Sequence, residues 1–277
     1  MEQRNAFSNM ECIQKWKLSE LSELVGQIED DMEKKTKNIK LGKDYSNIIL
    51  RIMSSSIVCM REIMCLCACG YPDGAMARAR LLCEHAVILE YFEIKKDKPN
   101  FKTIIENYHK NYEIQRLATC LFAARNVDCD KKAIKEIEDE INKLKSQIQS
   151  YKEGNEYWWT DQKSFSEIFK LVTNVNHSIN GHNTFFTQMH TDYQLACLQI
   201  HSSYLGNVWK IGRSKDITKI DTSPTLREHN IPLRFATRAL SVIVYNAYLH
   251  FTMDYEQYKE RFSELYTFYN QKHDSVE

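Results

Sequence analysis

The chain has 277 residues, enough to bury a full hydrophobic core as one large domain or two small ones. Lys plus Arg and Asp plus Glu number 37 each, so no net charge draws the protein onto nucleic acid or an anionic membrane. No apolar run reaches the roughly 18 residues that span a bilayer. Nothing at the N-terminus has the pattern of a signal peptide. We therefore expect a cytoplasmic protein without membrane contact, in which the nine cysteines are reduced thiols that fill apolar positions.

Only eight glycines and four prolines interrupt the chain, which favours long helices. Hydrophobic spacing near 3.6 residues predicts helices over about 11–41, 44–69, from the turn at 70–74 to 94, 101–125, 131–151, 164–175, 185–205 and 233–270. No alternation of strands and helices is visible, so a parallel sheet is not expected. The predicted fold is all-α, a single domain over residues 1–277 built as a bundle of about seven or eight helices.

The fifth predicted helix carries an apolar seam. Ile134, Ile137, Ile141, Leu144 and Ile148 are spaced alternately by three and four residues, as in the core positions of a coiled coil. Residues 127–154 are therefore predicted to form a protruding arm, either a helical hairpin or a coiled-coil surface. We expect 131–151 to contact a second copy in a homodimer or a partner protein.

The helix after the turn at 70–74 is apolar on nearly all sides yet contains ionisable residues, which are costly to bury unless they pair or do chemistry. Arg80 and Glu84 are four residues apart and share a face. They form either a structural ion pair or part of a reactive site. Arg78 and Arg80 precede His85 by seven and five residues, so both pairs fit Arg-x(4–6)-His.

That spacing resembles the motif of the HEPN superfamily, all-helical proteins of bacterial toxins, defence systems and RNA-processing enzymes. The resemblance implies a metal-independent ribonuclease site, usually completed across a dimer. In such a site Arg stabilises the phosphate and His transfers the proton. Leu81 stands after Arg80, where that superfamily often has a polar residue.

A polar stripe runs along the helix predicted at 185–205, where His190, Gln194, Cys197 and His201 recur at helical spacing. The stripe is either a solvated face or part of a site. His190 and His201 would lie ~16 Å apart along the axis, too far to share one metal ion. We therefore expect no metal and no cofactor.

Two segments together resemble a widespread helical bacterial family of unknown function, over about residues 70–206. Arg80-Leu-Leu-Cys-Glu84 is similar to its Arg-Ser-hydrophobic-hydrophobic-Glu pattern, and Tyr193-x3-Cys197-x3-His201 to its Tyr-x3-Ser-x3-His pattern. Cys197 stands where that family has Ser. The resemblance implies no reaction, but it implies that Arg80, Glu84 and His201 converge.

Residues 207–232 form a predicted basic loop that could contact phosphate or could be an ordinary solvated loop. Its Arg213, Lys215 and Arg227, with Arg78, are the predicted phosphate or nucleic-acid contacts.

Three hypotheses for function follow. The first is a HEPN-like ribonuclease, a toxin or anti-phage effector, with Arg80, Glu84, His85 and His201 as catalytic residues and RNA as its ligand. The alternative is a non-catalytic interaction or sensor module that acts through oligomerisation or a partner protein. The third is a metal-dependent hydrolase using His190, His201 and Glu84.

Overall fold

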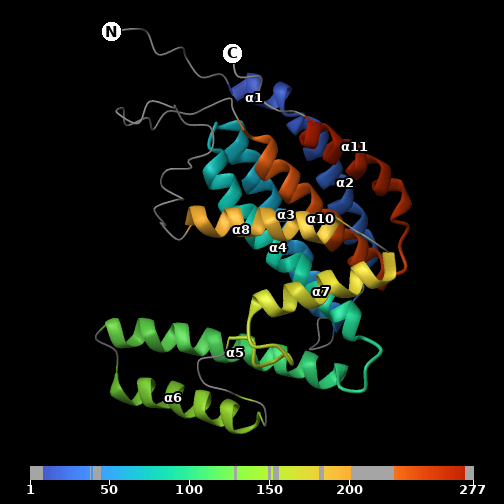
Figure 1. Ribbon diagram of the computed structural model, residues 1–277. Coiled ribbons are helices and arrows are strands. Elements are labelled where there is room, and N and C mark those ends of the chain that lie inside the picture. Colours follow the sequence, from blue (N-terminus) through green and yellow to red (C-terminus); the bar gives the residue numbers. More distant parts are fainter. Residues whose placement is uncertain are drawn as a thin grey trace, which may run out of the picture.

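The computed structural model describes residues 9–37, 39, 45–127, 130–148, 151, 156–180, 184–200 and 228–271. Those residues contain ten helices and no strand, which confirms the predicted all-α fold (Figure 1). The helices are α1 (Asn9–Lys15), α2 (Leu18–Thr36), α3 (Tyr45–Ala68), α4 (Pro72–Lys95), α5 (Phe101–Asn126), α6 (Lys131–Ser146), α7 (Phe165–Asn180), α8 (Thr184–Ile200), α10 (Asn230–His250) and α11 (Glu256–Gln271).

The described helices outnumber the predicted ones because two predicted helices are each broken once. Lys17 has φ 51° between α1 and α2, and Thr252 has φ 54° after α10. A positive φ cannot continue a right-handed helix, so each residue ends one helix before the next begins. Neither residue is a glycine or a proline, so the sequence carried no breaker signal at these points.

Helix α4 lies at the centre of the bundle. It packs against α3 and α10, and α7 and α8 also contact it (Figure 1). This position explains why α4 is apolar on nearly all sides. Gly70, with φ 81°, makes the turn from α3, a conformation that favours glycine, and Pro72 occupies the first turn of α4.

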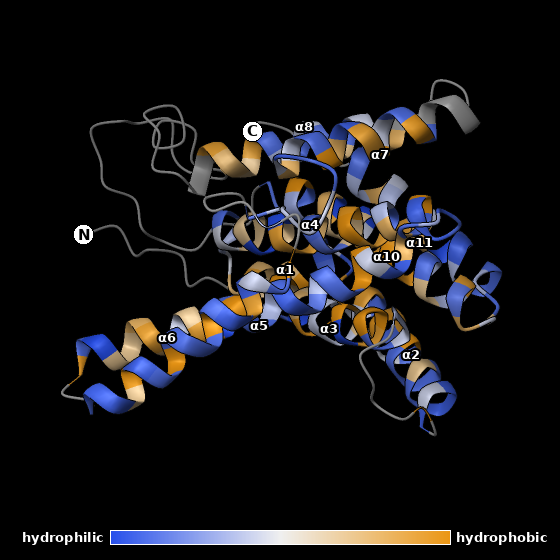
Figure 2. Ribbon diagram, turned by 90° about the horizontal axis from the view of Figure 1, so that it is seen from below, coloured by the Kyte–Doolittle hydropathy of each residue, from blue (hydrophilic) through white to orange (hydrophobic). Residues whose placement is uncertain are grey.

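Helices α5 and α6 form a hairpin that projects from the body of the molecule (Figure 2). Ile141 and Ile148 of the predicted seam are 7% and 6% exposed. Because α6 packs against α5 of the same chain, the arm is the helical hairpin of the two predicted alternatives. The apolar seam is thus largely covered within the chain.

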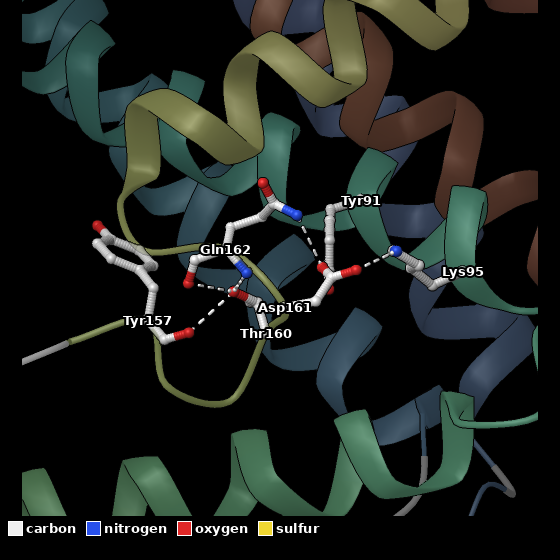
Figure 3. Close-up of polar contacts among 6 residues, drawn as sticks. All are labelled: Tyr91, Lys95, Tyr157, Thr160, Asp161 and Gln162. Atoms are coloured by element: carbon white, nitrogen blue, oxygen red, sulfur yellow. Dashed lines mark hydrogen bonds and ion pairs between the residues drawn. The ribbon is translucent and has the colours of Figure 1, made fainter. Parts of the chain in front are cut away.

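The segment between the arm and α7 packs onto α4. The Trp159 ring lies 4.7 Å from Tyr108 of α5 and 6.0 Å from Tyr91 of α4. Asp161 accepts hydrogen bonds from the Tyr91 hydroxyl at 3.0 Å and from Lys95 Nζ at 2.7 Å (Figure 3). These contacts fix the root of the arm to the central helix.

Candidate functional site

Four ionisable residues of α4, Arg80, Glu84, His85 and Glu90, meet partners on other helices. Arg80 and Glu84 face α8, where they contact Tyr193. His85 faces α3 and contacts Ser56. Glu90 accepts hydrogen bonds from Asn176 of α7 at 3.2 Å and from Asn246 of α10 at 2.9 Å. The ionisable groups are therefore accommodated by pairing, and their partners lie on three sides of the helix.

Arg80, Glu84 and Tyr193 form one connected group, which we call the α4–α8 cluster. Arg80 Nη2 lies 3.0 Å from Glu84 Oε1 and donates to the Tyr193 hydroxyl at 3.3 Å. The Tyr193 hydroxyl in turn donates to Glu84 Oε1 at 3.1 Å. The guanidinium carbon also lies 5.4 Å from the centre of the Tyr193 ring. Each of the three side chains thus contacts the other two.

The cluster lies at the edge of the core. The Arg80 and Glu84 side chains are 26% and 24% exposed, so a solute can reach them. Burial raises the pKa of the Glu84 carboxyl, while Arg80 and Tyr193 act to lower it. Burial acts to lower the pKa of Arg80, but the hydrogen bond with Tyr193 and the charge of Glu84 raise it above its ordinary value. Arg80 is therefore a permanent cation beside a carboxyl that accepts a proton more readily than usual.

A second polar contact holds α8 in place beside the cluster. Asp192 Oδ1 accepts from Arg234 Nη2 at 2.6 Å, and its Oδ2 lies 3.9 Å from Arg238 Nη1. Arg234 and Arg238 both belong to α10. Of two adjacent residues of α8, Asp192 therefore contacts α10 and Tyr193 contacts α4. Sequence reasoning missed this contact, because partners 42 and 46 residues apart on separate helices leave no spacing pattern.

His85 lies apart from the α4–α8 cluster. Its Nδ1 is 3.0 Å from the Ser56 hydroxyl of α3. Arg78 also faces α3, where its Nε lies 2.9 Å from Glu62 Oε2. The structure therefore places Arg80 and His85 against different helices, and Arg78 in an exposed ion pair of its own.

The described members of the polar stripe on α8 lie beside Tyr193. Cys197 follows one turn later and is partly buried. His190, one turn earlier, lies 4.7 Å from the Phe169 ring and 3.2 Å from the Gln194 amide. His201 and the predicted phosphate contacts Arg213, Lys215 and Arg227 lie outside the described residues.

Metal ligands do not gather in the part of the chain that the structure describes, where no group of three or more His, Cys, Asp or Glu side chains could hold an ion. No disulfide joins the described cysteines, which are Cys12, Cys59, Cys65, Cys67, Cys69, Cys83, Cys120 and Cys197. No helix among the described residues is long and apolar enough to cross a bilayer.

Comparison with known proteins identifies one family. A model of a family of unknown function, DUF5677, matches residues 46–216. The match runs from α3 to beyond α8 and contains all three residues of the α4–α8 cluster. It confirms the expected kinship with a family of unknown function. No curated protein and no solved structure matches the chain.

Proposed function

The chain belongs to DUF5677, a family of unknown function, and we propose that it is a HEPN-like, metal-independent ribonuclease acting at the α4–α8 cluster. The observation that carries the proposal is the Tyr193 hydroxyl, which joins Arg80 and Glu84 at 3.3 and 3.1 Å. A guanidinium fixed in this way at a partly exposed position is suited to a phosphate group, because its fork of donors is already oriented.

Arg80 has hydrogen-bond donors that the α4–α8 cluster does not use. Both of its contacts with the cluster are made by Nη2, and Nη1 has no hydrogen bond to the described residues. In the proposed complex Nη1 donates to a non-bridging phosphate oxygen, where negative charge develops as the phosphorus becomes five-coordinate. Glu84 and Tyr193 hold the guanidinium for this contact.

His201 is the proposed general base. It lies eight residues after Tyr193 in the sequence, outside the described residues. His201 takes the proton of a ribose 2′-hydroxyl, the 2′-oxygen attacks phosphorus, and the bond to the 5′-oxygen breaks. Glu84 stays paired with Arg80 and keeps the guanidinium oriented, and the leaving 5′-oxygen takes a proton from water. The products are a 2′,3′-cyclic phosphate and a 5′-hydroxyl, and Arg78, Arg213, Lys215 and Arg227 contact the RNA backbone.

The test is cleavage of single-stranded RNA by the purified full chain in EDTA, with and without its natural partners. We expect Arg80→Ala and His201→Ala each to lower the rate about 100-fold or more. His85→Gln and the matched control Arg61→Ala, at an arginine of α3 that pairs with Glu29 of α2, retain the rate. RNA left intact by wild-type protein, or equal loss in all four variants, would refute the proposal.

The arm supports a second candidate, a helical interaction module that binds a second copy of the chain. Phe122 and Val127 are 72% and 65% exposed at the far end of α5. Exposed large apolar side chains are candidates for contact surfaces. The seam of 131–151 largely faces α5, so the outer apolar residues of the arm are the proposed contact. We expect Phe122→Asp to convert a dimer to a monomer, as measured by light scattering. An unchanged mass would count against the interaction module.

A further inference from the structure

A cavity of about 420 Å³ lies at the root of the arm, where α3, α4 and α5 meet. Its size falls within the range of small-molecule sites, about 300–1,000 Å³. Polar side chains from all three helices line it, among them Arg51 of α3, His85 of α4 and Asn111 of α5. None of these residues belongs to the α4–α8 cluster.

The hydrogen bonds of Ser56 determine which nitrogen of His85 a ligand can use. The Ser56 hydroxyl donates its only hydrogen to the Ile52 carbonyl at 2.6 Å. It must therefore accept, at 3.0 Å, from His85 Nδ1, which carries the ring proton. Burial lowers the pKa of His85 to about 4, so the ring is neutral at pH 7. His85 Nε2 is thus a lone-pair acceptor for a donor in the cavity.

Arg51 of α3 supplies a cation to the cavity. Its side chain is exposed at the cavity and has no ion pair with the described residues. Glu113 also lines the cavity, but its carboxylate lies 2.9 Å from Arg116 Nε, which compensates its charge. The local field therefore favours an anion.

The remaining walls fit a planar, partly apolar group. Ile48, Ile52, Tyr108 and Tyr112 line the cavity, and Asn111, only 8% exposed, presents an amide within it. An amide recognises a group that both donates and accepts hydrogen bonds, and tyrosine rings stack on flat heterocycles.

We infer that this cavity binds a nucleotide carrying a phosphate monoester. The phosphate contacts Arg51, the base lies against the tyrosines near Asn111, and a base N–H or ribose hydroxyl donates to His85 Nε2. The ligand is either a free nucleoside monophosphate or the phosphorylated end of an RNA strand, which share this chemistry. The inference does not depend on the proposed ribonuclease activity.

Calorimetric titration of the full chain tests whether the cavity binds a nucleotide. The ligands are AMP, GMP, CMP, UMP, adenosine, inorganic phosphate and a 5′-phosphorylated tetranucleotide. The tetranucleotide carries 2′-O-methyl riboses, so it cannot be cleaved. We expect at least one nucleotide to bind more tightly than inorganic phosphate or adenosine. Tighter binding of the tetranucleotide identifies the RNA end as the ligand, and equal or weaker binding identifies the free nucleotide.

The variants locate the site. Arg51→Ala should weaken binding roughly tenfold to a hundredfold, and Ser55→Phe should block the cavity. Both positions are exposed, so neither change removes core packing. Arg61→Ala, on the same helix but away from the cavity, keeps wild-type affinity. No binding up to about 5 mM nucleotide, or wild-type affinity in both cavity variants, overturns the inference.

Discussion

The Tyr193 hydroxyl connects α8 to two charged residues of α4, Arg80 and Glu84. Replacing Tyr193 with Phe keeps the ring, which lies 5.1 Å from Phe165 and 5.8 Å from Phe169, but removes two hydrogen bonds to charged groups. We expect the free energy of unfolding to fall by about 2 kcal/mol, as for buried bonds of this kind. Urea unfolding followed by circular dichroism measures the change. Tyr112→Phe, at a side chain 50% exposed, is the control, and equal stability of the two variants would contradict the expectation.

His85 should make stability depend on pH. Burial lowers its pKa from 6.5 to about 4 in the folded protein, so the unfolded chain binds the proton more readily. The stabilisation from keeping the ring neutral is fully present above pH ~6.5. It is lost as the pH falls towards ~4 and amounts to about 3 kcal/mol.

The measurement compares wild type with His85→Gln by urea unfolding between pH 7.5 and 4.5. The other histidines are common to both proteins, so the difference isolates His85. We expect the wild type to lose more stability than the variant across this interval. Parallel pH profiles would show that His85 titrates normally.

Among the elements, the arm is the least supported by the rest of the fold. Helix α6 packs mainly against α5, and Ile141 is its one residue below 9% exposure. Ile141→Ala should cost about 2–4 kcal/mol, confined to this hairpin. Hydrogen exchange should therefore accelerate in α5 beyond Ile114 and in α6, and remain unchanged in α3, α4 and α10. Asp139→Ala, an exposed change on the same helix, is the control, and uniform acceleration over the whole chain would contradict this account.

The helices themselves were predictable, because their apolar periodicity and the few glycines and prolines mark them. The breaks at Lys17 and Thr252 were not, since a positive φ at a non-glycine residue is imposed by packing. The sequence could not predict that the arm is a hairpin within one chain. A seam with alternating spacing is equally suited to a neighbour in the same chain or in another.

Across the whole molecule, the sequence marked ionisable residues on apolar helices but not which of them meet between helices. Arg80 and Glu84 could be paired by spacing, and Tyr193 was part of a recognised pattern. Their contact depends on how α8 crosses α4, which no local signal encodes. Asp192 with Arg234 and the arm-root position of Arg51 and Asn111 were invisible for the same reason, because each is assembled from separate helices.

Taken together, α4 separates two polar regions, the α4–α8 cluster on one side and the arm-root cavity on the other. The α4–α8 cluster is the proposed ribonuclease site. The most direct measurement is mass spectrometry of a defined RNA oligonucleotide incubated with the full chain in EDTA. Our account predicts fragments ending in a 2′,3′-cyclic phosphate that are formed by wild type and His85→Gln but not by Arg80→Ala. An intact oligonucleotide, or the same fragments from Arg80→Ala at the wild-type rate, would contradict it.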